Sequence, residues 1–300
     1  MKYVSRALAV LAAALLAASA ACAFPAGGSV ENSKKGILVV AFGSSMPEGE
    51  ASIEAVTDAV RKAYPGVETR VAYTSRIITR KIARERGKTV DEPAVALAKM
   101  AYEGFTDVAV LSTHIIPGEE YDDLKAVVDG FRVIGATAPK AGFRFIGLSS
   151  PLLSGAEDFE RLAGVLADSY LERTKKGAFV FVGHGTRHFA NAAYGALQFA
   201  LWGKSHNFFV GTIEGSPSYD DVASGLKTAK VKDVWIAPAM LVAGDHAHND
   251  IAGPEPDSWK SMLEARGYRV TPVLEGLGQN AAVRGLILEK LSEAWGEFKP

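Results

Sequence analysis

DVAVLSTHIIPGEEYDD, residues 107–123, and DVWIAPAMLVAGDHAHN, residues 233–249, are the two stretches of sequence that decide the fold. Each begins with Asp-Val and an apolar run of strand length, and each continues through further apolar residues to a glycine and an acidic residue. The two stretches start 126 residues apart (233 − 107). Recurrence of one layout in the same order indicates that the chain contains a structural unit twice.

Apolar runs of strand length alternate with helical patterns on both sides of these stretches, which is typical of parallel βαβ units. The predicted strands cover residues 36–42, 68–73, 107–112 and 143–148 in the first half, and 177–183, 207–213, 233–239 and 269–275 in the second. Their continuous Val, Ile and Phe runs suit strands that helices cover on both faces. The predicted fold is therefore α/β, with two similar lobes around a cleft, each built on a roughly four-stranded parallel sheet flanked by helices.

We place the N-terminal lobe at residues 36–155 and the C-terminal lobe at residues 156–300. A segment with helical spacing at 159–173 joins them. In open α/β sheets, ligands bind beyond the carboxyl ends of the strands. The loops that follow those ends are where we expect the chemistry.

The first residues have the three-part layout of a secretory signal peptide. Lys2 and Arg6 precede an apolar run at 7–21, and Ala21-Cys22-Ala23 offers small residues for cleavage. The run is short for a membrane span. We expect residues 1–23 to be removed, leaving 277 residues (300 − 23) in the periplasm, with no stable membrane span and with 24–35 as a flexible tether.

Two other interpretations of this segment are an uncleaved anchor and a lipoprotein attached through Cys22. The lipoprotein is less favoured because Ser19 stands where such a signal carries an apolar residue. Cys22 is the single cysteine of the chain, so cleavage after Ala23 leaves no thiolate. Any metal must then be held by histidines and carboxylates.

Composition excludes several classes of protein. A net charge of −1 argues against a general nucleic-acid binder, which needs a basic surface. No glycine loop of the phosphate-binding kind occurs, so no nucleotide cofactor is expected. Homo-oligomers are the common case among soluble assemblies, and we expect one here.

Three successive strands of the second half each end next to a residue that can bind a metal ion. These residues are His184, Glu214 and His246, separated by 30 (214 − 184) and 32 (246 − 214) positions, which is one βα unit each. Strand ends of a parallel sheet lie at one edge, so the three side chains should converge there. Two imidazoles and a carboxylate suit Co²⁺, Fe²⁺, Ni²⁺ or Zn²⁺ and leave positions open for a substrate.

Five further residues are candidates for substrate binding: Ser44, Arg80, His114, His188 and His248. Ser44 lies after the first predicted strand, where a hydroxyl can hydrogen-bond a ligand. His114 is a candidate general base or metal contact, with a structural role as the alternative. We expect His188 and His248 either to hydrogen-bond the metal ligands or to be hydrated surface side chains.

Basic residues are concentrated in the predicted helix at 75–87. Arg76 or Arg80 can pair with substrate carboxylates, with Arg80 favoured by its reach. The alternative is an ordinary solvated helix face. Tyr194 and Trp259 can offer a flat apolar surface beside the site, although packing in the core is the default for both.

Several strings along the chain closely resemble the anaerobic-type sirohydrochlorin cobaltochelatases. They are FGSS (42–45), TSRIITRKI (74–82), THIIPGEEY (113–121), GHGTRHFANAAY (183–194), GTIEG (211–215), LVAGDHAHNDIAGPEPDSWK (241–260) and GLGQN (276–280). The likeness runs collinearly through residues 36–295. It implies the two-lobed class II chelatase fold, and it implies metal binding by His184, Glu214 and His246.

The resemblance further implies an enzyme that inserts Co²⁺, or alternatively Fe²⁺, into sirohydrochlorin with release of two protons. The metal is then a substrate. Most members of that family act in the cytoplasm, whereas this chain begins with an export signal. A second hypothesis is a periplasmic protein that binds and carries metal, haem or another tetrapyrrole. A zinc hydrolase ranks lower because no HExxH helix is present.

Overall fold

The computed structural model describes residues 33–300, so the predicted signal peptide and most of the tether lie outside the described residues. All eight predicted strands are present. They are β1 (Lys35–Ala41), β2 (Glu68–Tyr73), β3 (Asp107–Ser112), β4 (Phe145–Leu148), β5 (Ala178–Gly183), β6 (Phe208–Thr212), β7 (Asp233–Pro238) and β8 (Arg269–Pro272).

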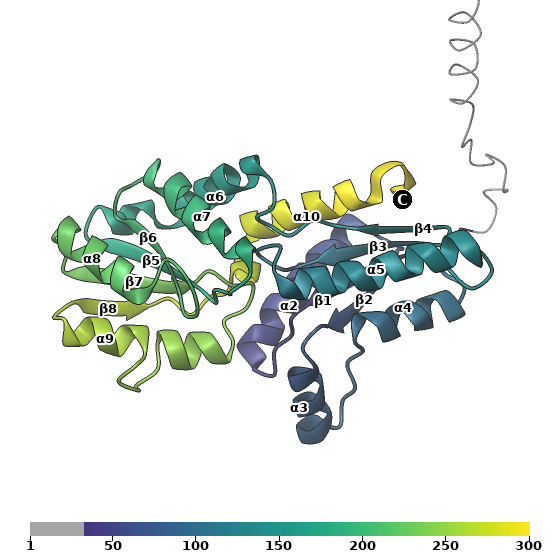
Figure 1. Cartoon of the computed structure of the whole chain (residues 1–300), viewed down its shortest axis with the longest axis horizontal. Helices are drawn as coiled ribbons and strands as arrows, with labels where there is room; N and C mark the ends of the chain where they lie inside the picture. Colours follow the sequence, from purple (N-terminus) through teal and green to yellow (C-terminus); the bar gives the residue numbers. More distant parts are fainter. Residues whose placement is uncertain (1–32) are drawn as a thin grey trace, which may run out of the picture. The chain divides into compact units, whose positions relative to one another are not determined.

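Helices connect the strands in both halves (Figure 1). They are α2 (Pro47–Ala63), α3 (Arg76–Arg86), α4 (Pro93–Tyr102), α5 (Glu119–Thr137), α6 (Ala156–Thr174), α7 (Ala192–Trp202), α8 (Tyr219–Ala229), α9 (Trp259–Ala265) and α10 (Ala281–Trp295). Short helical turns are η2 (Phe189–Asn191), η3 (Ala247–Ile251), η4 (Leu277–Gln279) and η5 (Gly296–Phe298). No helix in the described part of the chain is long and apolar enough to cross a membrane.

The two halves form separate sheets with the same topology. The first sheet has the order β2-β1-β3-β4 and the second the order β6-β5-β7-β8, and every pairing is parallel. Both sheets are four-stranded. The predicted fold class and the duplication are confirmed.

The duplication extends to individual side chains. Asp107 opens β3, and its Oδ2 lies 2.6 Å from Nη2 of Arg144, just before β4. Asp233 opens β7, and its Oδ1 lies 2.6 Å from Nε of Arg269, which opens β8. The same acid–arginine pair thus joins the third and fourth strands of each sheet at their amino ends.

One apolar core joins the two lobes. It combines buried residues of α2, β1 and β3 with those of β5, β6, α6 and α7. Helix α10 closes this core with Val283, Ile287, Leu291 and Trp295. Although it follows the second sheet in the chain, α10 packs against β3, β4 and α2 of the first half as well as against α6. Residues 281–295, which the sequence assigns to the C-terminal lobe, therefore contact both lobes.

A buried ion pair fixes α10 to α6. The Nζ of Lys290 lies 2.7 Å from Oδ1 of Asp158, with side-chain exposures of 11% and 9%. Asp158 also accepts hydrogen bonds from the backbone N–H groups of Gly155 (2.6 Å) and Ser154 (3.0 Å). Burial alone would raise the pKa of the Asp158 carboxyl, but these hydrogen bonds outweigh it and lower the pKa below its ordinary value.

Replacing Asp158 with Ala leaves the Lys290 ammonium buried without its partner. We expect Asp158→Ala to lower the free energy of unfolding near neutral pH by about 3–5 kcal/mol, measured by urea denaturation. Because the folded pKa of Asp158 lies below the unfolded one, its contribution is present above the unfolded pKa and is lost as pH falls through the folded pKa. The difference in the free energy of unfolding between the wild type and Asp158→Ala should therefore become smaller in strong acid.

The control is Glu172→Ala, which breaks the exposed pair between Lys175 and Glu172. We expect it to change stability by less than about 1 kcal/mol. An equally small effect of Asp158→Ala would contradict the assignment of a stabilising buried pair.

Candidate functional site

Three adjacent strands of the second sheet deliver the predicted metal ligands to one edge. β5 is central between β6 and β7, and His184 directly follows its last residue. The backbone N–H of Glu214, two residues beyond β6, donates to the carbonyl of His184 at 2.7 Å. Gly185 permits this approach, because its φ is +82° and a Cβ there would lie 2.5 Å from the Glu214 carbonyl oxygen. The loops after β5 and β6 are thus joined at their first residues.

The imidazoles of His184 and His246 lie side by side. Their ring centroids are 4.6 Å apart and the rings are nearly perpendicular, at 85°. His184 Nδ1 is 3.0 Å from the Gly185 carbonyl oxygen, and His246 Nδ1 is 2.5 Å from Oδ2 of Asp250. A carbonyl and a carboxylate only accept, so we assign the proton of each ring to Nδ1. Each Nε2 then carries a lone pair available to a metal ion.

Asp250 reaches His246 through an unusual helical turn. η3 has wide, π-type turns, in which the N–H of Ala252 donates to the carbonyl of Ala247 at 3.1 Å. Ala247 and Ile251 of this turn are fully buried and anchor it in the second lobe. A carboxylate on the second nitrogen of a ligating histidine fixes ring orientation and raises the basicity of the ligating nitrogen. Sequence reasoning missed Asp250.

The carboxylate of Glu214 does not complete a preformed trio. Its residue is exposed, and its side chain makes no hydrogen bond or ion pair within residues 33–300. Over the same residues, no three His, Cys, Asp or Glu side chains are grouped as a metal site. The side chains of His184 and His246 lie together, whereas Glu214 approaches His184 only through its backbone. The set of three metal ligands therefore stays a prediction.

His188 and His248 differ in their surroundings. The Nδ1 of His188 accepts from the N–H of Ala190 at 3.2 Å, and its Nε2 lies 3.4 Å from Oδ2 of Asp122 in α5. Both nitrogens of His188 thus have partners, and the side chain links the second lobe to the first. His248 lies on the η3 turn with a buried Nε2 that has no hydrogen-bond partner.

His114 follows the last residue of β3 by two positions and is half-buried in the first lobe. Its Nδ1 is 2.8 Å from the hydroxyl of Ser112, and its Nε2 is buried without a partner. Burial lowers the pKa of His114 to about 4. The ring is therefore neutral near pH 7 and is a weak base, and its predicted role in proton transfer stays a prediction.

Ser44 lies in the loop after β1, and Arg80 lies on helix α3 of the first lobe. Ser44 is buried, and its Oγ accepts from the N–H of Met46 at 3.0 Å. Arg80 is exposed on α3 and makes no ion pair or hydrogen bond within the described residues. The next residue, Lys81, has its Nζ 3.9 Å from Oδ2 of Asp245, which precedes His246. α3 therefore lies against the loop that carries the second imidazole.

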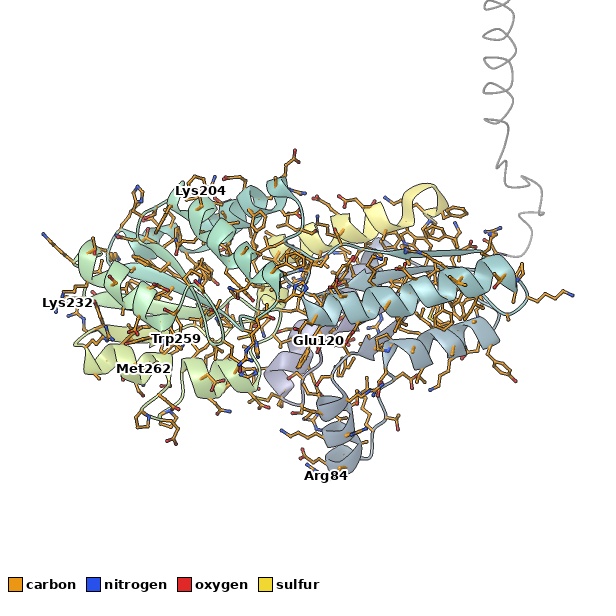
Figure 2. The ribbon with its side chains drawn as sticks, viewed as in Figure 1. Arg84, Glu120, Lys204, Lys232, Trp259 and Met262 are labelled. Carbon is orange, nitrogen blue, oxygen red and sulfur yellow. The ribbon has the colours of Figure 1, made fainter. Side chains whose placement is uncertain are left out.

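The two aromatic residues proposed as flat surfaces pack in the core. Tyr194 and Trp259 are each 3% exposed. Each lies beneath a strand glycine: a Cβ on Gly183 would be 2.2 Å from the Tyr194 ring, and one on Gly211 would be 2.3 Å from the Trp259 indole. In Figure 2, Trp259 lies within the second lobe near Met262. Both rings are buried, as the default interpretation expected, and Trp259 also lines a pocket together with Asp250.

The hydrogen bond between Asp250 and His246 can be tested by metal binding. Asp250→Ala removes the acceptor, and we expect the affinity for Co²⁺ to fall by about 10–100-fold. Asp250→Asn retains an acceptor oxygen and should lose less. Titration of the metal-free protein with Co²⁺, followed by absorption, measures both.

Asp257 supplies the matched control. It lines the same pocket of about 370 Å³ as Asp250 but contacts neither histidine. Asp257→Ala should bind Co²⁺ like the wild type. The positioning role of Asp250 is ruled out if Asp250→Ala binds the ion as tightly as this control.

Comparison with known proteins shows the family. The cobalt chelatase (CbiK) family model matches residues 35–296. A sirohydrochlorin cobaltochelatase, CbiKC, of Nitratidesulfovibrio vulgaris (strain Hildenborough) is 42% identical over 262 residues, which cover 87% of this chain and 90% of the relative. A sirohydrochlorin cobaltochelatase of Salmonella typhimurium LT2 is 36% identical over 262 residues, which cover 87% of this chain and 96% of the relative.

Solved structures show the same fold at low sequence identity. SirB from Bacillus subtilis with Fe³⁺ superposes with a TM-score of 0.60 and 13% identity, covering 88% of this chain and 97% of SirB. CbiX, described as the terminal enzyme of sirohaem biosynthesis in denitrifying bacteria, superposes with a TM-score of 0.52 and 18% identity, covering 86% of this chain and 99% of CbiX. Both superpose on most of this chain, so the predicted two-lobed α/β fold is confirmed. With its sequence matched along nearly all of the described residues, the chain belongs to the cobalt chelatase (CbiK) family.

Proposed function

We propose that this protein is a sirohydrochlorin cobaltochelatase, an enzyme that transfers Co²⁺ to the four pyrrole nitrogens of sirohydrochlorin. The observation that carries the proposal is the pair of imidazoles at the carboxyl edge of the second sheet, with ring centroids 4.6 Å apart and each Nδ1 hydrogen-bonded. Two neutral imidazoles hold a borderline ion such as Co²⁺ while leaving coordination positions free. The curated relatives with the same activity in their names support it.

His184 and His246 have two tasks in this reaction. They first bind the incoming ion through Nε2, and the exposed Glu214 beside His184 supplies a carboxylate oxygen at the same edge. As Co²⁺ moves to the ring, two pyrrole N–H protons must leave. The two Nε2 lone pairs released by the metal, or Glu214, accept them, since a histidine suits proton transfer near neutral pH.

The substrate lies between the lobes in this proposal. Arg80 of α3, with no acidic partner in the described part of the chain, is available to a peripheral carboxylate of the tetrapyrrole. The contact of Lys81 with Asp245 places α3 beside the loop of His246. Fe²⁺ favours an overlapping set of ligands, so we propose it as an alternative metal substrate. Haem binding belongs to the rival carrier hypothesis.

A chelatase assay tests the proposal. Mature protein, sirohydrochlorin and either Co²⁺ or Fe²⁺ are mixed, and metallation is followed in the absorption spectrum. We expect the wild type to accelerate metallation and His246→Ala to lose more than about 100-fold of that rate, beyond the range for loss of an outer-shell partner. His206→Ala, an exposed histidine beside Trp202, is the control and should keep full activity.

Two outcomes would count against the chelatase. Metallation no faster than without protein would end the proposal, and tight stoichiometric tetrapyrrole binding without turnover would favour a carrier. Full activity of His246→Ala would instead contradict the role of His246 in the metal site, and the assignment as a chelatase would still stand.

We also propose that the protein is exported to the periplasm. We further propose that it forms a homo-oligomer. The signal at residues 1–23 supports export, and the general prevalence of homo-oligomers supports the assembly. N-terminal sequencing of protein from the periplasmic fraction should give Phe24 as the first residue. A chain that begins at Met1, or a lipid-modified Cys22, would contradict the cleavage. Light scattering of the purified protein measures the assembly.

A further inference from the structure

An exposed aromatic side chain stands at the carboxyl end of the first sheet. Phe42 follows the last residue of β1 and is 46% exposed, although Ala41 and Ser44 beside it are almost fully buried. Single exposed apolar side chains are common and need no explanation by themselves. The position of Phe42 in the duplicated fold makes it informative.

Phe42 is the first-lobe equivalent of His184. The N–H of Ser75 donates to the carbonyl of Phe42 at 3.1 Å, as the N–H of Glu214 donates to the carbonyl of His184 at 2.7 Å. The next residue is a glycine with positive φ in both lobes: Gly43 at +108° and Gly185 at +82°. The backbone is therefore the same, and an aromatic ring occupies the position of a predicted metal ligand.

The loop that carries Phe42 meets the second lobe next to His246. A Cβ built on Gly244 would lie 3.7 Å from Oγ of Ser44, two residues after Phe42. In addition, Lys81 of α3 contacts Asp245, which follows Gly244 in the second lobe. Helix α5, which follows the loop after β3, also reaches the second lobe, through the contact of Asp122 with His188. Glu120, labelled in Figure 2, marks this end of α5 at the boundary between the lobes.

Two arginines near these loops have no partners. Among the arginines of residues 33–300, Arg80 and Arg187 alone make no hydrogen bond, ion pair or contact with an aromatic ring. Arg80 comes from the first lobe, and Arg187 follows His184 by three residues in the second. An exposed ring at the end of β1, together with unpaired guanidinium groups on the segments that follow β2 and β5, suits a flat apolar ligand with carboxylates at its edge.

We propose that Phe42 contacts the face of the tetrapyrrole ring and that Arg187 binds one of its peripheral carboxylates, so that the pyrrole nitrogens are held toward His184 and His246. The inference rests on the proposed function and names the groups that recognise its organic substrate. Both are substrate-binding residues, and neither holds the metal. At the position where the second lobe has the imidazole of His184, the first lobe has the ring of Phe42, which offers an apolar surface to the macrocycle.

Kinetics with each substrate varied separately test Phe42. We expect Phe42→Ala to raise KM for sirohydrochlorin roughly tenfold or more, from the loss of buried aromatic area, and to leave the affinity for Co²⁺ unchanged. Phe42→Tyr keeps the ring and should restore KM. Phe199→Ala is the matched control, because Phe199 is 76% exposed on α7, away from the strand ends.

The role of Arg187 predicts a salt-sensitive effect. Arg187→Ala should raise KM for sirohydrochlorin by roughly two- to fivefold at low ionic strength and less at high ionic strength, and Arg187→Lys should recover part of the loss. Lys232→Ala removes an exposed cation at the amino end of β7, labelled in Figure 2, and should have no effect.

Absorption titration of metal-free sirohydrochlorin separates the two levels of inference. A wild type that neither binds nor metallates sirohydrochlorin overturns the proposed function and this inference with it. A wild type that metallates, with Phe42→Ala and Arg187→Ala matching Phe199→Ala and Lys232→Ala in KM and binding, overturns this inference alone.

Discussion

The parallel pairing of β6, β5 and β7 is the constraint on which the candidate site depends. Parallel strands end at one edge of a sheet, so the loops after them meet there, although their residues are 30 or more positions apart in the chain. The bond between the Glu214 N–H and the His184 carbonyl continues this pairing beyond the strands. The paired imidazoles follow from the register of β5 with β7, and a shifted β7 would separate the loops that carry them.

A rigid contact between the lobes is the second requirement, since a site with groups from both lobes needs a defined spacing. α10 supplies much of it by returning to β3 and β4 after the second sheet is complete. The apolar core continues across both lobes, and the buried Lys290–Asp158 pair fixes α10 to α6. The contacts of Lys81 with Asp245 and of His188 with Asp122 link segments of the two lobes that follow the strand ends.

Duplication explains how one backbone serves two kinds of chemistry. Phe42 and Ser75 in the first lobe have the same backbone bonding as His184 and Glu214 in the second. His114 corresponds in the same way to Met240, because the carbonyl of each accepts from the N–H of a leucine, Leu152 or Leu277. His246 corresponds to Glu120, because the carbonyls of Gly118 and Gly244, each two residues earlier, accept from the N–H groups three and four residues further on. The turn that follows in the second lobe is η3, which brings Asp250 to His246.

The eight strands, their parallel arrangement, the duplication and the strand-end positions of His184, Glu214 and His246 could be predicted from the sequence. These features depend on local apolar periodicity and on the rule that parallel strands share an edge. Only the tertiary structure decided that α10 packs on both lobes, that Asp250 faces His246, that the Nε2 of His114 is buried without a partner, and that Phe42 is exposed. The reason is physical: burial and the choice of hydrogen-bond partner depend on groups brought together from distant parts of the chain, and the residue types alone do not carry that information.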